Sequence, residues 1–286
     1  MSVYEIKTVA VLGAGTMGNG IAHVFARAGY NVILRDVETR FLDRGLETIG
    51  KNLDREVKKE KIAASEKPLI LARIQATTDL AALATADFAV EAVPEQLDLK
   101  VRLLKDVDAV LKPGVILASN TSSISITQLG AQTSRPEKFI GMHFMNPVPV
   151  MALVEVIRGL ATSDDTFEIT KILCERLEKK AVAVNDAPGF VSNRVLMPLI
   201  NEAAFAVMEG VATPEAVDAV MKMGMNHPMG PLELADFIGL DVCVNILEVL
   251  QTGFGDPKYR ACPLLRKYVA AGWLGRKSGR GFYKYS

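Results

Sequence analysis

Two residues of types that can move protons lie in consecutive apolar stretches. His143, one of the chain's three histidines, lies in GMHFMNP, and Glu155 is the only charge in the run from residue 148 to 157. A carboxylate in an apolar run is costly unless it has a polar partner, and a carboxylate orients an imidazole and makes it more basic. If the two stretches are neighbouring strands, we predict a general-base pair. A core histidine satisfied by backbone is the alternative, which Glu155 disfavours.

The other two histidines are predicted to be structural or peripheral. His23 falls in IAHVF, which is typical of a helix surface, and His227 falls in the turn GMNHPMGP. Neither has a matching buried carboxylate in the sequence.

A glycine-rich segment, GAGTMG at residues 13–18, follows an apolar run and precedes a helical pattern. In this context the first glycine permits a tight turn, the second admits a pyrophosphate and the third packs helix on strand. The helix N-terminus also offers N–H groups to the anion. The predicted cofactor contacts are Gly13, Gly15, Thr16, Met17 and Gly18. A bare structural turn is the alternative.

Asp36 lies 23 residues after Gly13, at the end of the second predicted strand. A carboxylate there accepts hydrogen bonds from ribose hydroxyls, which favours NAD over NADP. Arg35 and Arg40 flank it and, if turned inward, would meet a 2′-phosphate. NADP therefore remains an alternative cofactor.

Polar residues also follow the next two predicted strands, in EAVPEQLDLK at residues 91–100 and ASNTSS at residues 118–123. Ligands of doubly wound sheets lie beyond the carboxyl ends of the strands. For residues 120–123, capping of the following helix is an equal alternative. The residues expected near this crevice are Ala92, Val93, Glu95, Lys100, Asn120 and Ser122.

The elements that must position these residues alternate between strand and helix. Lys7–Leu12, the helix after Gly15 and Tyr30–Leu34 form a βαβ unit with parallel strands. A helical excursion occupies residues 38–75, and alternation then resumes from Phe88. We predict an α/β fold, a Rossmann-like doubly wound sheet over residues 1–186.

After Pro188 only helical spacing remains, which predicts an all-α C-terminal domain over residues 187–286. Asn193, early in its first helix, either caps a neighbour or points into the interdomain cleft, and the cleft is favoured. The helix Pro188–Met208 is apolar around most of its circumference. It is therefore expected to be buried against another subunit or against the first domain.

Composition limits the partners of this 286-residue chain. Lys plus Arg equals Asp plus Glu at 33 each, so no global field attracts nucleic acid or an anionic membrane. The three cysteines form no close pair, which predicts no metal site and suits a reducing compartment. The start MSVYE followed by a strand pattern leaves no room for a signal peptide, and no apolar run is long enough to span a bilayer. We expect a soluble cytoplasmic protein with small-molecule partners.

Six segments together resemble the (S)-3-hydroxyacyl-CoA dehydrogenase family, and most closely its short bacterial members that act on 3-hydroxybutyryl-CoA. They cover nearly the whole chain in the family's order. The segments are GAGTMGNGIA, SNTSSISIT, GMHFMNPVPVMALVEVIRG, DAPGFVSNR, NHPMGPLELADFIGLD and GRKSGRGFYKYS.

This resemblance implies reversible hydride transfer between NAD and a 3-hydroxyacyl-CoA. His143 would be the base, Glu155 would hold it, and Ser122 and Asn193 would position the substrate. The resemblance also implies closure of the domains over the substrate and a homodimer formed through the C-terminal domain. The cofactor residues that it implies are the glycine loop, Asp36, Glu95, Lys100 and Asn120.

A basic helix face in the excursion is a candidate site for the 3′-phosphate of CoA, as the resemblance implies, with an ordinary solvated face as the alternative. Its residues are Lys51, Arg55, Lys58, Lys59 and Lys61, of which Lys51 and Lys58 are the predicted contacts. One departure from the family is visible, since Phe144-Met145 stands where two phenylalanines are common. Two alternatives concern the substrate, which could be a longer 3-hydroxyacyl-CoA or a sugar acid such as L-gulonate. A third alternative is a non-catalytic protein that binds a dinucleotide.

Overall fold

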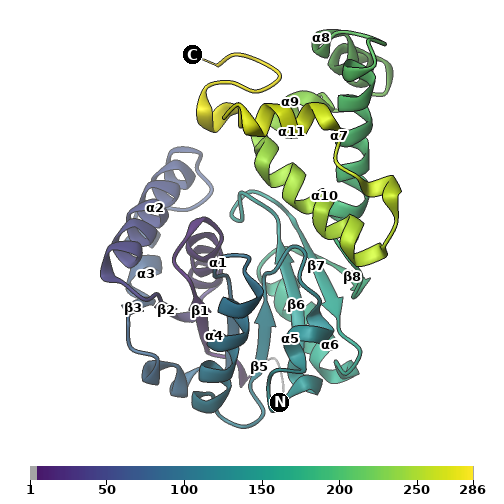
Figure 1. Cartoon of the computed structure of the whole chain (residues 1–286). Coiled ribbons are helices and arrows are strands. Elements are labelled where there is room, and N and C mark those ends of the chain that lie inside the picture. The colour runs from purple at the N-terminus through teal and green to yellow at the C-terminus, as the bar shows by residue number, and fades with distance from the viewer. Residues whose placement is uncertain (1–4, 286) are drawn as a thin grey trace. The chain divides into compact units, whose positions relative to one another are not determined.

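The computed structural model describes residues 5–285, and the chain divides into two compact units between Asp186 and Ala187 (Figure 1). Met1 to Tyr4, which are predicted to lead into the first strand, lie outside the described residues. Each unit is built around its own hydrophobic core.

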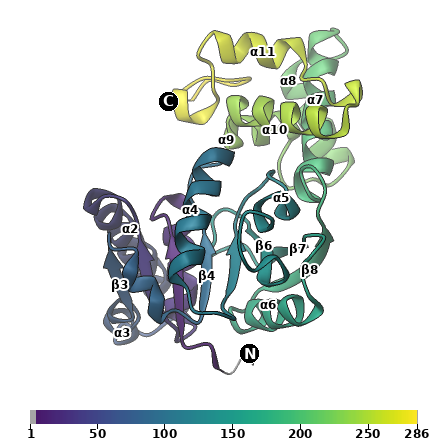
Figure 2. The ribbon, with the colours of Figure 1, turned by 60° about the horizontal axis from the view of Figure 1, so that its bottom comes forward.

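Among the described residues, eight strands of the first unit form one sheet in the order β3-β2-β1-β4-β5-β6-β7-β8. Figures 1 and 2 show β3 at one edge and β8 at the other. The direction of the strand order reverses between β1 and β4, as in doubly wound folds. The strands are β1 (Thr8–Leu12), β2 (Asn31–Arg35), β3 (Ile74–Thr77), β4 (Phe88–Glu91), β5 (Ile116–Ser119), β6 (Phe139–Phe144), β7 (Leu153–Arg158) and β8 (Lys180–Asn185).

Most neighbouring strands are parallel, which confirms the predicted Rossmann-like sheet. The exception is the pair β6 and β7, which is antiparallel and joined by the segment after Phe144. Because parallel strands end on the same side, β1, β2, β4, β5 and β6 deliver their carboxyl ends to one edge of the sheet.

The edge strand β3 departs from the sequence prediction, in which residues 38–75 are helical and strands resume only at Phe88. The strand has four residues, IQAT, and pairs only through Val32–Arg35 of β2. A short, half-polar edge strand carries little periodic signal and is fixed by its tertiary partner.

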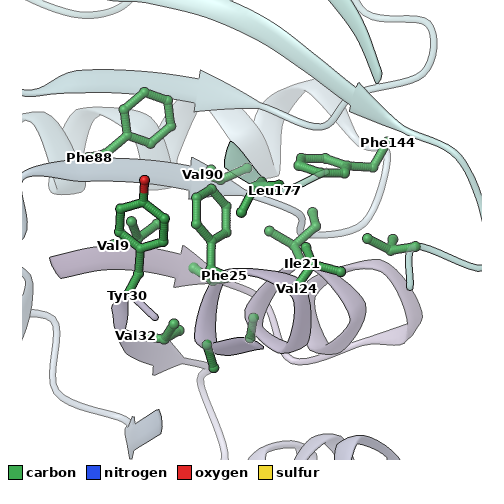
Figure 3. Packing of buried hydrophobic residues seen from close by; sticks show 14 of the residues in the cluster. Val9, Ile21, Val24, Phe25, Tyr30, Val32, Phe88, Val90, Phe144 and Leu177 are labelled. Carbon is green, nitrogen blue, oxygen red and sulfur yellow. The ribbon is translucent and has the colours of Figure 1, made fainter. Parts of the chain in front are cut away.

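Helices cover both faces of the sheet. The largest cluster of buried apolar residues joins α1, α2 and α6 to the side chains of the central strands. Figure 3 shows Ile21, Val24 and Phe25 of α1 beside Val9, Val90 and Phe144 of the strands. The helices of the first unit are α1 (Thr16–Arg27), α2 (Thr39–Lys58), α3 (Glu66–Ala72), α4 (Leu97–Val110), α5 (Ile126–Gly130), α6 (Asp164–Arg176) and the short η2 (Ala81–Thr85) and η3 (Pro136–Lys138).

The prediction that His23 lies on a helix surface without a buried carboxylate partner was wrong. Its side chain is fully buried, and its Nε2 lies 3.4 Å from Oε1 of Glu56, itself buried on α2. The helix pattern of α1 gave no sign of this contact because α2, from the helical excursion, packs over the outer face of α1. His23 and Glu56 therefore form a buried histidine–carboxylate pair between α1 and α2.

The second unit is helical, as predicted. Its core is built on α7, α9, α10 and α11, with Met197, Leu232 and Leu247 fully buried. Its elements are α7 (Ser192–Met208), α8 (Pro214–Ala219), the π-helical η4 (Val220–Gly224), α9 (Pro231–Ile238), α10 (Leu240–Phe254), η5 (Pro257–Tyr259), α11 (Pro263–Ala270) and η6 (Arg276–Ser278).

The cysteines are free and buried. Burial raises the pKa of the Cys174 and Cys243 thiols to about 12, so neither is a reactive thiolate at neutral pH. Within residues 5–285, no helix combines the length and apolarity that crossing a bilayer requires.

The contribution of the buried Arg135 side chain to the stability of the fold can be tested. Its guanidinium contacts the Asp108 carboxylate at 2.5 Å and donates to the carbonyls of Asp108, in the last turn of α4, and of Leu111, Lys112 and Val115, which follow the helix. We expect Arg135→Met to cost about 3 kcal/mol, because it leaves a carboxylate and several buried carbonyls without their donor.

For a protein of this size the change corresponds to a fall in Tm of about 6–12 °C, measured by circular dichroism. Arg102→Met, on the exposed side of the same helix, is the matched control and should change stability by less than about 0.5 kcal/mol. An unaltered Tm for the Arg135 variant would show that these contacts of the Arg135 guanidinium do not stabilise the fold.

Candidate active site

The glycine loop turns sharply between β1 and α1. Gly13 adopts φ +94°, a conformation that side chains rarely adopt, and its N–H donates to the Arg35 carbonyl at 2.8 Å. A Cβ on Gly18 would lie 1.7 Å from the Gly13 carbonyl oxygen. A Cβ on Gly13 would lie 2.8 Å from the carbonyl oxygen of Ala92, so the loop also packs against the segment after β4.

The loop has the features that a dinucleotide pyrophosphate requires. A Cβ on Gly15 would meet no other atom within 4 Å, so the backbone of this residue faces open space. The helix α1 starts at Thr16-Met17 with no side-chain cap and no acidic residue in its first turn. Its N–H groups and positive dipole end are therefore available to an anion.

Asp36 lies beside this loop, as predicted for a ribose-binding carboxylate. Its Oδ2 accepts from the N–H of Ala14 and its Oδ1 from the N–H of Val37, each at 2.6 Å. A carboxylate has about four acceptor positions, so capacity remains for ribose hydroxyls. Arg40 is turned to Glu38, with 2.7 Å between its Nε and the Glu38 Oε2.

His143 and Glu155 meet across the antiparallel pair of strands. They are direct partners in the β6–β7 register, and His143 Nδ1 lies 2.8 Å from Glu155 Oε2. Both residues are buried, at 8% and 2% exposure. An ionised carboxylate only accepts hydrogen bonds, so the Nδ1 that faces Glu155 is assigned the proton.

The loop after β5 is held by one carboxylate oxygen. Glu95 Oε1 accepts from the backbone N–H groups of Ser122 and Ser123, each at 2.9 Å, and from the hydroxyls of Thr121, Ser122 and Ser123. Burial alone would raise the pKa of Glu95, but the Lys100 charge and these hydrogen bonds lower it below its ordinary value. Ser122 and Glu95 thus form one cluster.

Asn120 joins the ends of two strands. Its Oδ1 accepts from the N–H of Phe144 at 2.9 Å, directly after His143. Its own N–H donates to the carbonyl of Glu91, the last residue of β4. Asn120, which is predicted to lie near the cofactor, therefore links the ends of β4 and β5 through its backbone and the end of β6 through its side chain.

Lys100 lies one turn into α4 and is almost fully buried. Its Nζ donates to both oxygens of Glu91, at 2.8 and 2.9 Å, and to the Val93 carbonyl at 3.2 Å. Glu91 is absent from the site residues predicted from the sequence. The signal was available, because Glu91 is a carboxylate at the end of the apolar strand FAVE, the same pattern that distinguishes Glu155.

Two predicted site residues of the first unit are not gathered into this cluster. Lys51 and Lys58 lie on exposed positions of α2, and Lys51 pairs with Glu47 at 2.5 Å. Asn193 lies in the first turn of α7 and belongs to the second unit. Within the described part of the chain, no group of three or more His, Cys, Asp or Glu side chains could hold a metal ion.

A doubly wound sheet that carries a glycine-rich phosphate loop, a carboxylate after β2 and a histidine–glutamate pair defines a dinucleotide-dependent oxidoreductase. The family model for the 3-hydroxyacyl-CoA dehydrogenase NAD binding domain matches residues 8–187, and that for its C-terminal domain matches residues 189–285. The chain belongs to the 3-hydroxyacyl-CoA dehydrogenase family, and its cofactor is NAD. The predicted family and the predicted cofactor are both confirmed.

Individual relatives are similar over nearly their whole length. A probable 3-hydroxybutyryl-CoA dehydrogenase of Bacillus subtilis is 57% identical over 281 residues, covering 98% of each chain. The 3-hydroxybutyryl-CoA dehydrogenase of Bradyrhizobium diazoefficiens is 55% identical over 98% of this chain and 96% of its own. The crystal structure of an (S)-3-hydroxybutyryl-CoA dehydrogenase from Ralstonia eutropha, 53% identical, superposes with a TM-score of 0.96 over 99% of this chain and 100% of that one.

Two glycine variants test the cofactor loop. Gly15→Ala should leave the Tm unchanged, because its Cβ meets no protein atom, but should weaken NADH binding at least about tenfold by filling the space for the pyrophosphate. Gly18→Ala should lower the Tm itself, since its Cβ collides with backbone. Thermal melts and NADH fluorescence titrations measure the two effects. Full NADH affinity in Gly15→Ala would place the pyrophosphate elsewhere.

Proposed function

We propose that the protein catalyses the reversible, NAD-dependent interconversion of (S)-3-hydroxybutyryl-CoA and acetoacetyl-CoA. The observation that carries the proposal is the buried contact between His143 and Glu155, in the same sheet whose strand β1 leads into the glycine loop. The names of the similar proteins from Bacillus subtilis and Bradyrhizobium diazoefficiens support the substrate.

His143 acts as the general acid and base of this reaction. With Nδ1–H donated to Glu155, the Nε2 lone pair accepts the proton of the 3-hydroxyl group during oxidation and returns it during reduction. The resulting imidazolium is stabilised by the adjacent Glu155 carboxylate, which is buried and therefore poorly screened by water. When bound, NAD supplies the acceptor or donor of the hydride.

Other residues bind and orient the substrate in this proposal. Ser122 and Asn193 hydrogen-bond the reacting oxygen and the thioester carbonyl. Glu95 keeps Ser122 in place through the loop contacts described above. Lys51 and Lys58, exposed on α2, contact the 3′-phosphate of CoA.

We further propose that residues 1–186 bind NAD, that residues 187–286 complete the substrate site and form a homodimer, and that the enzyme works in the cytoplasm. Several large apolar side chains of the second unit are exposed, which favours association through it. They include Val195, Met208, Val211 and Met223. Light scattering of the purified protein tests the dimer, and a monomer at micromolar concentration would contradict it.

The enzymatic proposal is tested with acetoacetyl-CoA by following the absorbance of NADH and, in parallel, NADPH. We expect rapid loss of NADH and a much slower loss of NADPH. His143→Gln should lower kcat by about 10²–10⁴-fold, the range that general acid–base catalysis contributes, without changing NADH affinity.

Glu155→Gln provides a matched test of the pair. It keeps the size of the side chain but removes the charge that stabilises the imidazolium, so kcat should fall at least about tenfold while the KM for acetoacetyl-CoA changes little. If wild-type protein consumes neither cofactor, longer 3-ketoacyl-CoAs and then L-gulonate with NAD distinguish a different substrate from a non-catalytic protein.

A further inference from the structure

A second buried carboxylate underlies the loop that carries Ser122. Glu91 is completely buried at the end of β4, and its only cationic contact among the described residues is Lys100, whose side chain is 1% exposed. All three donors of the Lys100 ammonium have acceptors, the two Glu91 oxygens and the Val93 carbonyl. A contact between Lys100 and the cofactor would therefore need one of these bonds to be exchanged.

Glu91 is linked to the loop through Ser119. The Ser119 hydroxyl donates to Glu91 Oε1, and its oxygen accepts from the N–H of Thr121 at 3.1 Å. The Thr121 hydroxyl in turn donates to Glu95 at 2.5 Å. A continuous chain of hydrogen bonds thus runs from the buried ion pair to the residues on each side of Ser122.

Both carboxylates lie close to the Lys100 ammonium group. Lys100 Nζ lies 3.4 Å from Glu95 Oε2, while Glu95 Oε1 holds the Ser122 and Ser123 N–H groups. As long as Glu91 is ionised, it satisfies the charge of Lys100, and Glu95 stays with the loop. Without that charge, the buried ammonium has Glu95 as its nearest anion, because an unpaired charge in the interior is strongly unfavourable.

We propose that Glu91 is a positioning residue for the reaction. Because the Glu91 carboxylate compensates the charge of Lys100, the Glu95 carboxylate remains bound to the backbone N–H and hydroxyl of Ser122. This role rests on the proposed function, in which Ser122 binds the substrate. It concerns the geometry of the loop, and Glu91 itself does not touch the reacting atoms.

The test compares Glu91→Gln with the double variant Glu91→Gln/Lys100→Met. The single variant leaves a buried cation that draws Glu95 off the loop, so kcat should fall about 10- to 100-fold, as expected for a misplaced substrate contact. The double variant removes both charges while keeping similar volumes, an exchange that buried ion pairs often tolerate. Because Lys100 is itself a predicted cofactor contact, the double variant is compared by the order of the loop and not by kcat.

Amide hydrogen exchange, read by mass spectrometry over residues 119–124, provides a measurement that does not depend on the substrate. Exchange in this segment should accelerate in Glu91→Gln and return toward wild type in the double variant, with the rest of the sheet unchanged. Lys105→Met, an exposed lysine of α4, is the matched control and should alter neither exchange nor kcat.

Each outcome decides one question. Unchanged exchange over residues 119–124 in Glu91→Gln, or exchange in the double variant as fast as in the single one, overturns the positioning role. Accelerated exchange throughout the sheet with a lowered Tm also overturns it, since Glu91 would then only stabilise the fold. If wild-type protein does not reduce acetoacetyl-CoA, the proposed function fails, while the exchange data still decide whether Glu91 orders the loop.

Discussion

A carboxylate buried in an apolar strand requires a polar partner at that position, and this constraint organises the edge of the sheet where the parallel strands end. Glu155 is compensated by His143 and Glu91 by Lys100, each at 2.8 Å. The partners differ in chemistry. The ammonium group of a lysine only donates hydrogen bonds, whereas an imidazole has two ring nitrogens of which one can accept while the other donates.

The antiparallel step from β6 to β7 makes the first of these pairs possible. In a wholly parallel sheet, residues near the ends of consecutive strands are separated by a crossover helix. Here the chain turns back directly, so His143 and Glu155, only 12 residues apart, become direct neighbours on one face. The remaining parallel strands deliver the glycine loop, Asp36 and the Ser122 loop to the same edge.

The loops at this edge are held by side chains more than by secondary structure. Glu95 collects the N–H groups and hydroxyls of the Ser122 segment, and Asn120 ties β5 to the strand of His143. In the proposed reaction, donors and acceptors that are fixed before the substrate binds would reduce the reorganisation that the reaction requires. Asp36 has a similar role beside the glycine loop, where it accepts from the Ala14 N–H.

The sequence by itself determined the alternation of strands and helices, the glycine loop and the family, because these depend on local periodicity and on motifs of fixed spacing. It also singled out His143 and Glu155, since an isolated polar residue in an apolar run is visible without a structure. The tertiary structure decided the rest. The edge strand β3, the burial of His23 under α2 and the Glu91–Lys100 pair all depend on which segments meet in space, and such contacts between separate elements leave no periodic signal in the sequence.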